Sequence, residues 1–85
     1  MPKTIFGGEH RHLVAVLVHA RQASGLTQAE LAARLGKDQS FVSIIERGQR
    51  RVDVLEFVAL AKAMDVDPTQ LFERVTTKLS KAMRV

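Results

Sequence analysis

Signals that start and stop helices recur so closely along this sequence that only short helices fit between them. Gly25, Gly36 and Gly48 each follow an apolar stretch with helical spacing. A glycine at such a position can adopt the left-handed conformation that ends a helix. The segments 27–30 (TQAE) and 53–56 (DVLE) match the capping-box pattern, in which the first and fourth side chains each bond the other residue's backbone amide.

The apolar residues between these signals predict five helices and an all-α fold, because no segment alternates as a core strand does. Asp38 is a suitable N-cap, and Asp67 precedes Pro68, a residue that suits the first position of a helix. The predicted helices span residues 9–24, 28–35, 39–47, 54–64 and 68–83. The expected core residues are Leu13, Val16, Leu17, Ala20, Leu31, Ala32, Leu35, Val42, Ile45, Leu55, Val58, Leu60, Ala61, Leu71, Phe72, Val75, Leu79 and Met83.

Length and composition limit the chain to one compact domain. Its 85 residues contain no cysteine, which excludes a disulfide framework, a thiolate metal site and a cysteine nucleophile. The longest strictly apolar run, residues 13–18, is far shorter than the roughly 20 residues of a membrane span. The N-terminus has no signal-peptide pattern. We therefore expect a soluble cytoplasmic protein with no membrane contact.

The charge of the chain is unevenly distributed. The formal net charge is +4, a balance that by itself only weakly favours acidic partners. Residues 34–52 hold five cations and two carboxylates, and residues 74–85 hold four cations and no carboxylate. Residues 53–73 between them hold five carboxylates and one lysine. The first basic block covers the end of the second predicted helix and the whole of the third.

The second and third predicted helices are joined by only three residues, 36–38. A connection of that length containing glycine sets two helices at a steep angle, as in a helix-turn-helix. Val42 and Ile45 give the third helix one apolar face, which leaves its opposite face free to enter a major groove. On this pattern alone, an apolar three-helix core without any role in DNA binding fits equally well.

The order and spacing of several short motifs resemble the lambda-repressor-like, Cro-type helix-turn-helix family of phage and bacterial regulators. The motifs are GLTQAELA at 25–32, LG at 35–36, QS at 39–40, VS at 42–43, ERG at 46–48, LA at 60–61 and VDP at 66–68. The resemblance covers about residues 11–73. It implies a compact five-helix DNA-binding domain, with the helix-turn-helix in its second and third helices, that usually works as a dimer on a two-fold-related operator.

The resemblance also implies roles for individual residues. Gln28 matches a glutamine that contacts phosphate, and Gln39 and Ser40 match the main base-reading positions. Ser43 faces the same way. Ile44 departs from the polar or basic side chain found in many relatives, so it can make only apolar contact, for example with a thymine methyl group.

The basic turn after the third helix supplies the expected contacts to the DNA backbone. We expect Arg47, Arg50 and Arg51 to bind phosphates, with Lys37 as a weaker candidate. Phe41 matches a bulky position of the family, which leaves packing and DNA contact both open.

Arg21 and Glu46 occupy positions that form an ion pair in some relatives. We expect the same pair here, in a structural role that orients the third helix.

The organisation that we predict is an N-terminal arm at 1–8, the DNA-binding domain at 9–73 and a basic extension of the last helix at 74–85. The last helix carries more apolar surface than three short neighbours need. Its candidate homodimer contacts are Phe72, Val75, Leu79 and Met83. The alternative is that this surface belongs entirely to the core of its own chain.

Catalytic and metal sites have little support in the sequence. His10, His12 and His19 lack the spacing and partners of a metal site. No serine has the neighbours of a catalytic nucleophile, and no glycine loop suits a phosphate. We therefore expect no enzyme activity, no metal and no cofactor.

The sequence thus predicts a transcriptional regulator that binds double-stranded DNA as a homodimer. A phage-type repressor, a restriction–modification controller and an antitoxin all remain open. The main alternative is a protein-interaction module that has kept the fold and lost base readout. The apolar side chain of Ile44 is the feature that favours this alternative. A metal-responsive regulator that uses His10, His12 and His19 is a weaker alternative.

Overall fold

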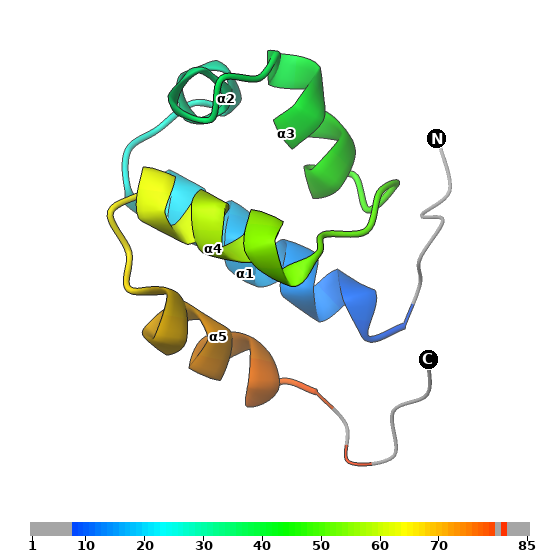
Figure 1. Ribbon diagram of the computed structural model, residues 1–85. Helices are drawn as coiled ribbons and strands as arrows, with labels where there is room; N and C mark the ends of the chain where they lie inside the picture. Colours follow the sequence, from blue (N-terminus) through cyan, green and yellow to red (C-terminus); the bar gives the residue numbers. More distant parts are fainter. Residues whose placement is uncertain (1–7, 80, 82–85) are drawn as a thin grey trace.

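The computed structural model describes residues 8–79 and 81, and it consists of helices packed around one core (Figure 1). The helices are α1 (His10–Ala23), α2 (Gln28–Arg34), α3 (Gln39–Glu46), α4 (Val54–Ala63) and α5 (Pro68–Thr76). The described residues contain no strand, so the predicted all-α fold is confirmed. The predicted N-terminal arm lies outside the described residues except for Gly8.

Local hydrogen bonds explain why α2 and α4 begin where the sequence predicts. Thr27 Oγ1 accepts from the Glu30 amide at 3.1 Å, and Glu30 Oε1 accepts from the Thr27 amide at 2.9 Å. The equivalent distances between Asp53 and Glu56 are 2.7 and 3.0 Å, so both capping boxes are present. Asp38 has the extended conformation of an N-cap, but its side chain makes no capping hydrogen bond.

The last helix is shorter than the predicted span of 68–83, which is therefore wrong at its C-terminal end. The hydroxyl of Thr77 donates to the Arg74 carbonyl oxygen at 3.1 Å, where the Lys78 amide would bond in a continuing helix. The Lys78 amide instead donates to the Val75 carbonyl oxygen at 3.0 Å, and the backbone tightens into turns. Met83 lies outside the described residues.

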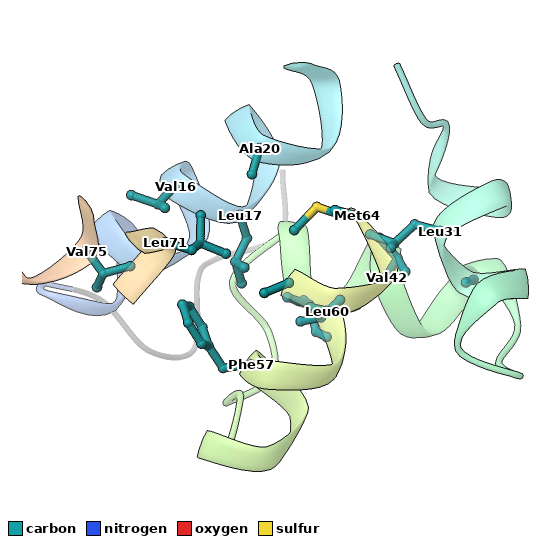
Figure 2. Close-up of a cluster of buried hydrophobic side chains, with 13 residues drawn as sticks. Val16, Leu17, Ala20, Leu31, Val42, Phe57, Leu60, Met64, Leu71 and Val75 are labelled. Carbon is teal, nitrogen blue, oxygen red and sulfur yellow. The ribbon is translucent and has the colours of Figure 1, made fainter. Parts of the chain in front are cut away.

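The core gathers apolar side chains from all five helices (Figure 2). Its buried members are Val16, Leu17, Ala20, Leu31, Ala32, Val42, Ile45, Phe57, Leu60, Ala61, Met64, Leu71 and Val75. Most were expected from the spacing of apolar residues, and Leu13, Leu35 and Leu79 pack against this core while only partly buried.

The register of α4 differs from the prediction, in which Leu55 and Val58 faced the core. Leu55 is 81% exposed and Val58 is half-buried, whereas Phe57 is buried. The buried side of α4 is Phe57, Leu60, Ala61 and Met64, and the spacing i, i+3, i+4, i+7 places all four on one helix face. Phe72 of α5, also expected in the core, is 55% exposed.

The arrangement of the helices separates α3 from α5. Helices α1 and α4 lie between the α2–α3 pair and α5 (Figure 1), and α1 contacts both α3 and α5. The outward face of α3 is therefore on the side of the molecule opposite α5. None of the helices in the described part of the chain has the length and apolar composition that a membrane span requires.

Replacement of Leu71 by alanine should destabilise the fold by about 2–5 kcal/mol, because it empties a fully buried site between α1 and α4. The matched replacement Leu55→Ala should change the free energy of unfolding by less than about 0.5 kcal/mol, because Leu55 is exposed. Urea unfolding followed by circular dichroism measures both. A loss of about 2 kcal/mol or more for Leu55→Ala would contradict the register described for α4.

Candidate nucleic-acid interface

The turn between α2 and α3 has the geometry that a helix-turn-helix needs. Gly36 adopts a left-handed φ of 68°, and the Lys37 amide then donates back to the Ala32 carbonyl oxygen at 2.9 Å. These features end α2 abruptly and redirect the chain into α3. Ala32 is completely buried, and its small side chain lets the two helices pack closely.

The two faces of α3 differ in the way that the sequence predicts. Val42 and Ile45 are buried in the core, while Gln39 and Ser40 at the start of the helix are exposed. Ser43 and Ile44 are half-buried. The helix therefore presents polar side chains to solvent at its N-terminal end.

The carboxylate of Glu46 fixes α3 to both preceding helices. Nε and Nη2 of Arg21 on α1 donate to Glu46 Oε2 and Oε1 at 2.7 and 3.0 Å. Gln28 Nε2 on α2 also donates to Oε1, at 2.8 Å. The side chains of Arg21 and Glu46 are only 13% and 9% exposed, and these hydrogen bonds raise the pKa of Arg21. The ion pair expected from the family resemblance is thus present.

The network continues from Glu46 to the exposed end of α3. Gln28 Oε1 accepts a hydrogen bond from Gln39 Nε2 at 3.3 Å. The expected phosphate contact and the expected base-reading side chain are therefore joined to each other in the free protein. The sequence gives no signal for this bond, because Gln28 and Gln39 lie on different helices, 11 residues apart.

Arg50 has partners within the protein that the sequence analysis did not identify. Its Nη1 and Nη2 donate to the two carboxylate oxygens of Glu56 at 2.9 and 2.6 Å, and Nη1 also donates to the Arg51 carbonyl oxygen at 2.8 Å. The pair with Arg50 lowers the pKa of Glu56 to about 2. The sequence predicts only a capping role for Glu56, which Glu56 also fulfils.

The other expected phosphate contacts are more accessible. Lys37, Arg47 and Arg51 are exposed, and the ion pairs found among the described residues do not include Lys37 or Arg47. Lys37 Nζ lies 5.4 Å from the centre of the Phe41 ring, and the guanidinium of Arg50 lies 5.0 Å from it. Phe41 is half-buried and packs against the core.

The expected dimer contacts have different environments. Val75 is buried, and Figure 2 shows it with Leu71 among the core side chains, so its side chain is used within its own chain. Leu79 is half-buried, while Phe72 is exposed and meets Phe57 edge to face at 5.8 Å. Val54 and Leu55, at the start of α4, are also exposed.

The three histidines do not come together. His12 Nε2 lies 3.8 Å from Glu9, and His19 Nδ1 lies 2.8 Å from Nη2 of Arg74. Burial lowers the pKa of His10. Within residues 8–79, no three side chains are placed to hold a metal ion.

A domain with this turn, and with one polar helix face held outward, is a helix-turn-helix domain. The helix-turn-helix family model matches residues 18–71, which is more than half of the chain. The chain therefore belongs to the Cro-type helix-turn-helix family of DNA-binding transcriptional regulators.

Individual relatives agree with this assignment. An uncharacterised HTH-type transcriptional regulator of Sinorhizobium fredii is 41% identical over 51 residues, which is 60% of this chain and 66% of that protein. An XRE-family-like protein from Pseudomonas syringae has a similar structure, with a TM-score of 0.78, 42% identity and coverage of 85% of this chain and 88% of its own. The restriction–modification controller protein C.AhdI from Aeromonas hydrophila is also similar, with a TM-score of 0.69 and 39% sequence identity. The match covers 75% of this chain and 93% of C.AhdI.

Removal of the Glu46 carboxylate should have a large effect on stability. Glu46→Ala leaves the charge of Arg21 and an amide of Gln28 without their shared acceptor, so we expect a loss of about 3 kcal/mol in the free energy of unfolding. Glu73→Ala, which removes an exposed carboxylate of α5, should cost less than about 0.5 kcal/mol. Denaturant unfolding measures both variants. Similar values would show that the Glu46 network contributes little.

Proposed function

We propose that the protein binds duplex DNA sequence-specifically as a homodimer, on an operator with two-fold symmetry. The observation that carries this proposal is the exposed start of α3, where the side chains of Gln39 and Ser40 are accessible to solvent. The other end of the same helix is fixed by Glu46. A side chain that reads a base edge must be accessible and must be held in a defined position.

The chemistry of α3 supports direct readout in the major groove. The amide of Gln39 can pair bidentately with adenine, and its bond to Gln28 restricts the orientations available before DNA arrives. Ser40 and Ser43 can donate to or accept from either a base or a phosphate. The half-buried Ile44 can contact a thymine methyl group.

The exposed cations support contact with the DNA backbone. Lys37 lies just before α3, and Arg47 and Arg51 lie just after it, so they flank the proposed reading helix. Contacts of this kind give affinity and orientation without base preference. Gln28 adds a neutral contact on the same side.

An apolar surface on α4 and α5 supports the dimer. Val54 lies three residues before Phe57 on α4, and Phe57 meets Phe72 of α5 edge to face. Val54, Leu55 and Phe72 form what we call the α4–α5 patch, and all three side chains are more than half exposed. A second copy that covers Phe72 would lie on the α5 side of the molecule, away from α3 (Figure 1).

Selection from random duplex DNA tests base readout directly. We expect enrichment of a two-fold-symmetric motif whose half-sites are centred about 34 Å apart, one turn of DNA. The exposed Lys37, Arg47 and Arg51 give six cations in a dimer, so the log–log salt slope on the selected duplex should be about −5. Binding without any enriched motif would refute specific readout and leave the protein-interaction module as the better function.

Substitution within the α4–α5 patch tests the dimer. Phe72→Glu places a charge in the proposed interface, so the variant should be monomeric by light scattering and should bind the selected duplex at least about tenfold more weakly. Gln70→Glu adds the same charge at another exposed position of α5 and should leave both properties unchanged. A Phe72→Glu variant with the same mass and affinity as the parent would place the interface elsewhere.

The resemblance to C.AhdI favours one of the biological roles that the sequence left open. We propose control of a restriction–modification gene pair as the first role to test. A reporter placed behind the selected motif would respond to the protein if the motif is a control element. A reporter that does not respond would count against this role.

A further inference from the structure

The guanidinium of Arg50 is already largely occupied within the protein. Both Nη1 hydrogens are used, one by Glu56 and one by the Arg51 carbonyl oxygen, and Nη2 donates to the second oxygen of Glu56. The guanidinium carbon also lies over the Phe41 ring, 5.0 Å from the ring centre. The Arg50 side chain is still 39% exposed. It therefore makes these hydrogen bonds and this ring contact although it is not buried.

Phe41 connects this arginine to the start of α3. It follows Gln39 and Ser40 directly, and its amide donates to the Asp38 carbonyl oxygen at 3.0 Å in the first turn of the helix. Its ring packs against the core on one side and against Arg50 on another. The Phe41 ring therefore links Arg50 to the first turn of α3.

Glu56 connects the same arginine to α4. Its carboxylate also accepts from the Asp53 amide at 3.0 Å, in the capping box that begins α4. The contacts run without a gap from α4 through Glu56 and Arg50 to Phe41. The Glu46 network holds the other end of α3, so the helix is fixed at both ends by different helices.

We propose that Arg50 is a positioning residue that holds the first turn of α3 against α4 through Phe41 and Glu56, and that it does not bind phosphate. This inference rests on the proposed function, because it concerns how the same interface reads duplex DNA. This positioning role replaces the phosphate binding that the sequence predicts for Arg50.

The strength of the existing contacts supports this assignment. Bidentate hydrogen bonds between a guanidinium and a carboxylate are among the strongest in proteins. A phosphate that drew Arg50 away would break them, and it would leave the Glu56 carboxylate unpaired beside the negative DNA backbone. Exposed Arg47 can meet a phosphate without losing any ion pair found among the described residues.

The decisive experiment compares four variants on the selected duplex and on a scrambled duplex of equal length, over a range of salt concentrations. Arg50→Gln removes the charge, and Glu56→Gln keeps an acceptor for the Asp53 amide but breaks the ion pair. The double variant tests whether the two residues act together. Arg47→Gln is the matched control, because it removes an exposed arginine three residues away.

We expect Arg50→Gln and Glu56→Gln each to lose about tenfold in affinity for the selected duplex and little for the scrambled one. The double variant should lose no more than either single variant, and the salt slopes should stay near that of the parent. Arg47→Gln should weaken binding to both duplexes and reduce the slope by about 1.8, the value for one lost phosphate contact in each subunit.

Two outcomes would overturn the inference. Arg50→Gln would then behave like Arg47→Gln, with a shallower slope and equal losses on both duplexes. Alternatively, Glu56→Gln would bind both duplexes more tightly with a steeper slope, as expected if Glu56 merely restrains an arginine that binds phosphate.

Amide hydrogen exchange tests the positioning role without DNA, and so separates it from the proposed function. Arg50→Gln and Glu56→Gln should speed exchange at residues 41–44 and 47–52, while Arg47→Gln should leave these rates unchanged. Unchanged rates in the first two variants would refute the positioning role. Faster exchange in a protein that selects no motif would keep the inference about α3 and refute only the proposed readout.

Discussion

The arrangement of α1, α2 and α3 depends on the hydrogen bonds that the Glu46 carboxylate accepts. This carboxylate accepts hydrogen bonds from Arg21 and Gln28, which belong to two different helices, while Glu46 itself ends a third. Helices of seven and eight residues are too short to be stable alone in water. Their stability must come from packing, and the Glu46 network specifies one orientation among those that apolar contacts would permit.

The α2–α3 pair combines apolar packing with charged contacts at its borders. Ala32, Val42 and Ile45 bury one side completely, and that burial brings the helices together. At the border of this core, Glu46 forms an ion pair with Arg21 at the C-terminal end of α3. Glu56 forms an ion pair with Arg50, which lies over Phe41 in the first turn of α3. The acidic block of the sequence therefore does more than balance the net charge, since Glu56 comes from that block and meets an arginine of the basic block.

Local interactions made most of the fold predictable from the sequence. The capping boxes at Thr27 and Asp53 involve residues three apart, so their partners can be identified from spacing alone. The end of α5 was missed because the side chain of Thr77 competes for a backbone carbonyl oxygen, an effect that apolar spacing does not show. The register of α4 was missed because both Leu55 and Phe57 begin an apolar helical pattern, and only packing against α5 distinguishes them.

The candidate site was less predictable for a related reason. The residues that face solvent on α3 follow from its apolar face, but the partners of those residues do not. Arg50 and Glu56 are separated by a loop, and Gln28 and Gln39 lie on different helices. Family resemblance gave the pair between Arg21 and Glu46, whereas contacts outside its motifs required the three-dimensional structure.

The alternation of buried and exposed positions along α3 has a consequence for the evolution of such a regulator. Val42 and Ile45 hold the helix in the core, while Gln39 and Ser40 are exposed and contribute no buried apolar surface. Substitutions at these two exposed positions can therefore accumulate without weakening the core that holds the helix. Under the base readout proposed for these positions, a lineage with this domain can acquire a new DNA preference through a few mutations in one turn of helix, without first gaining stability elsewhere.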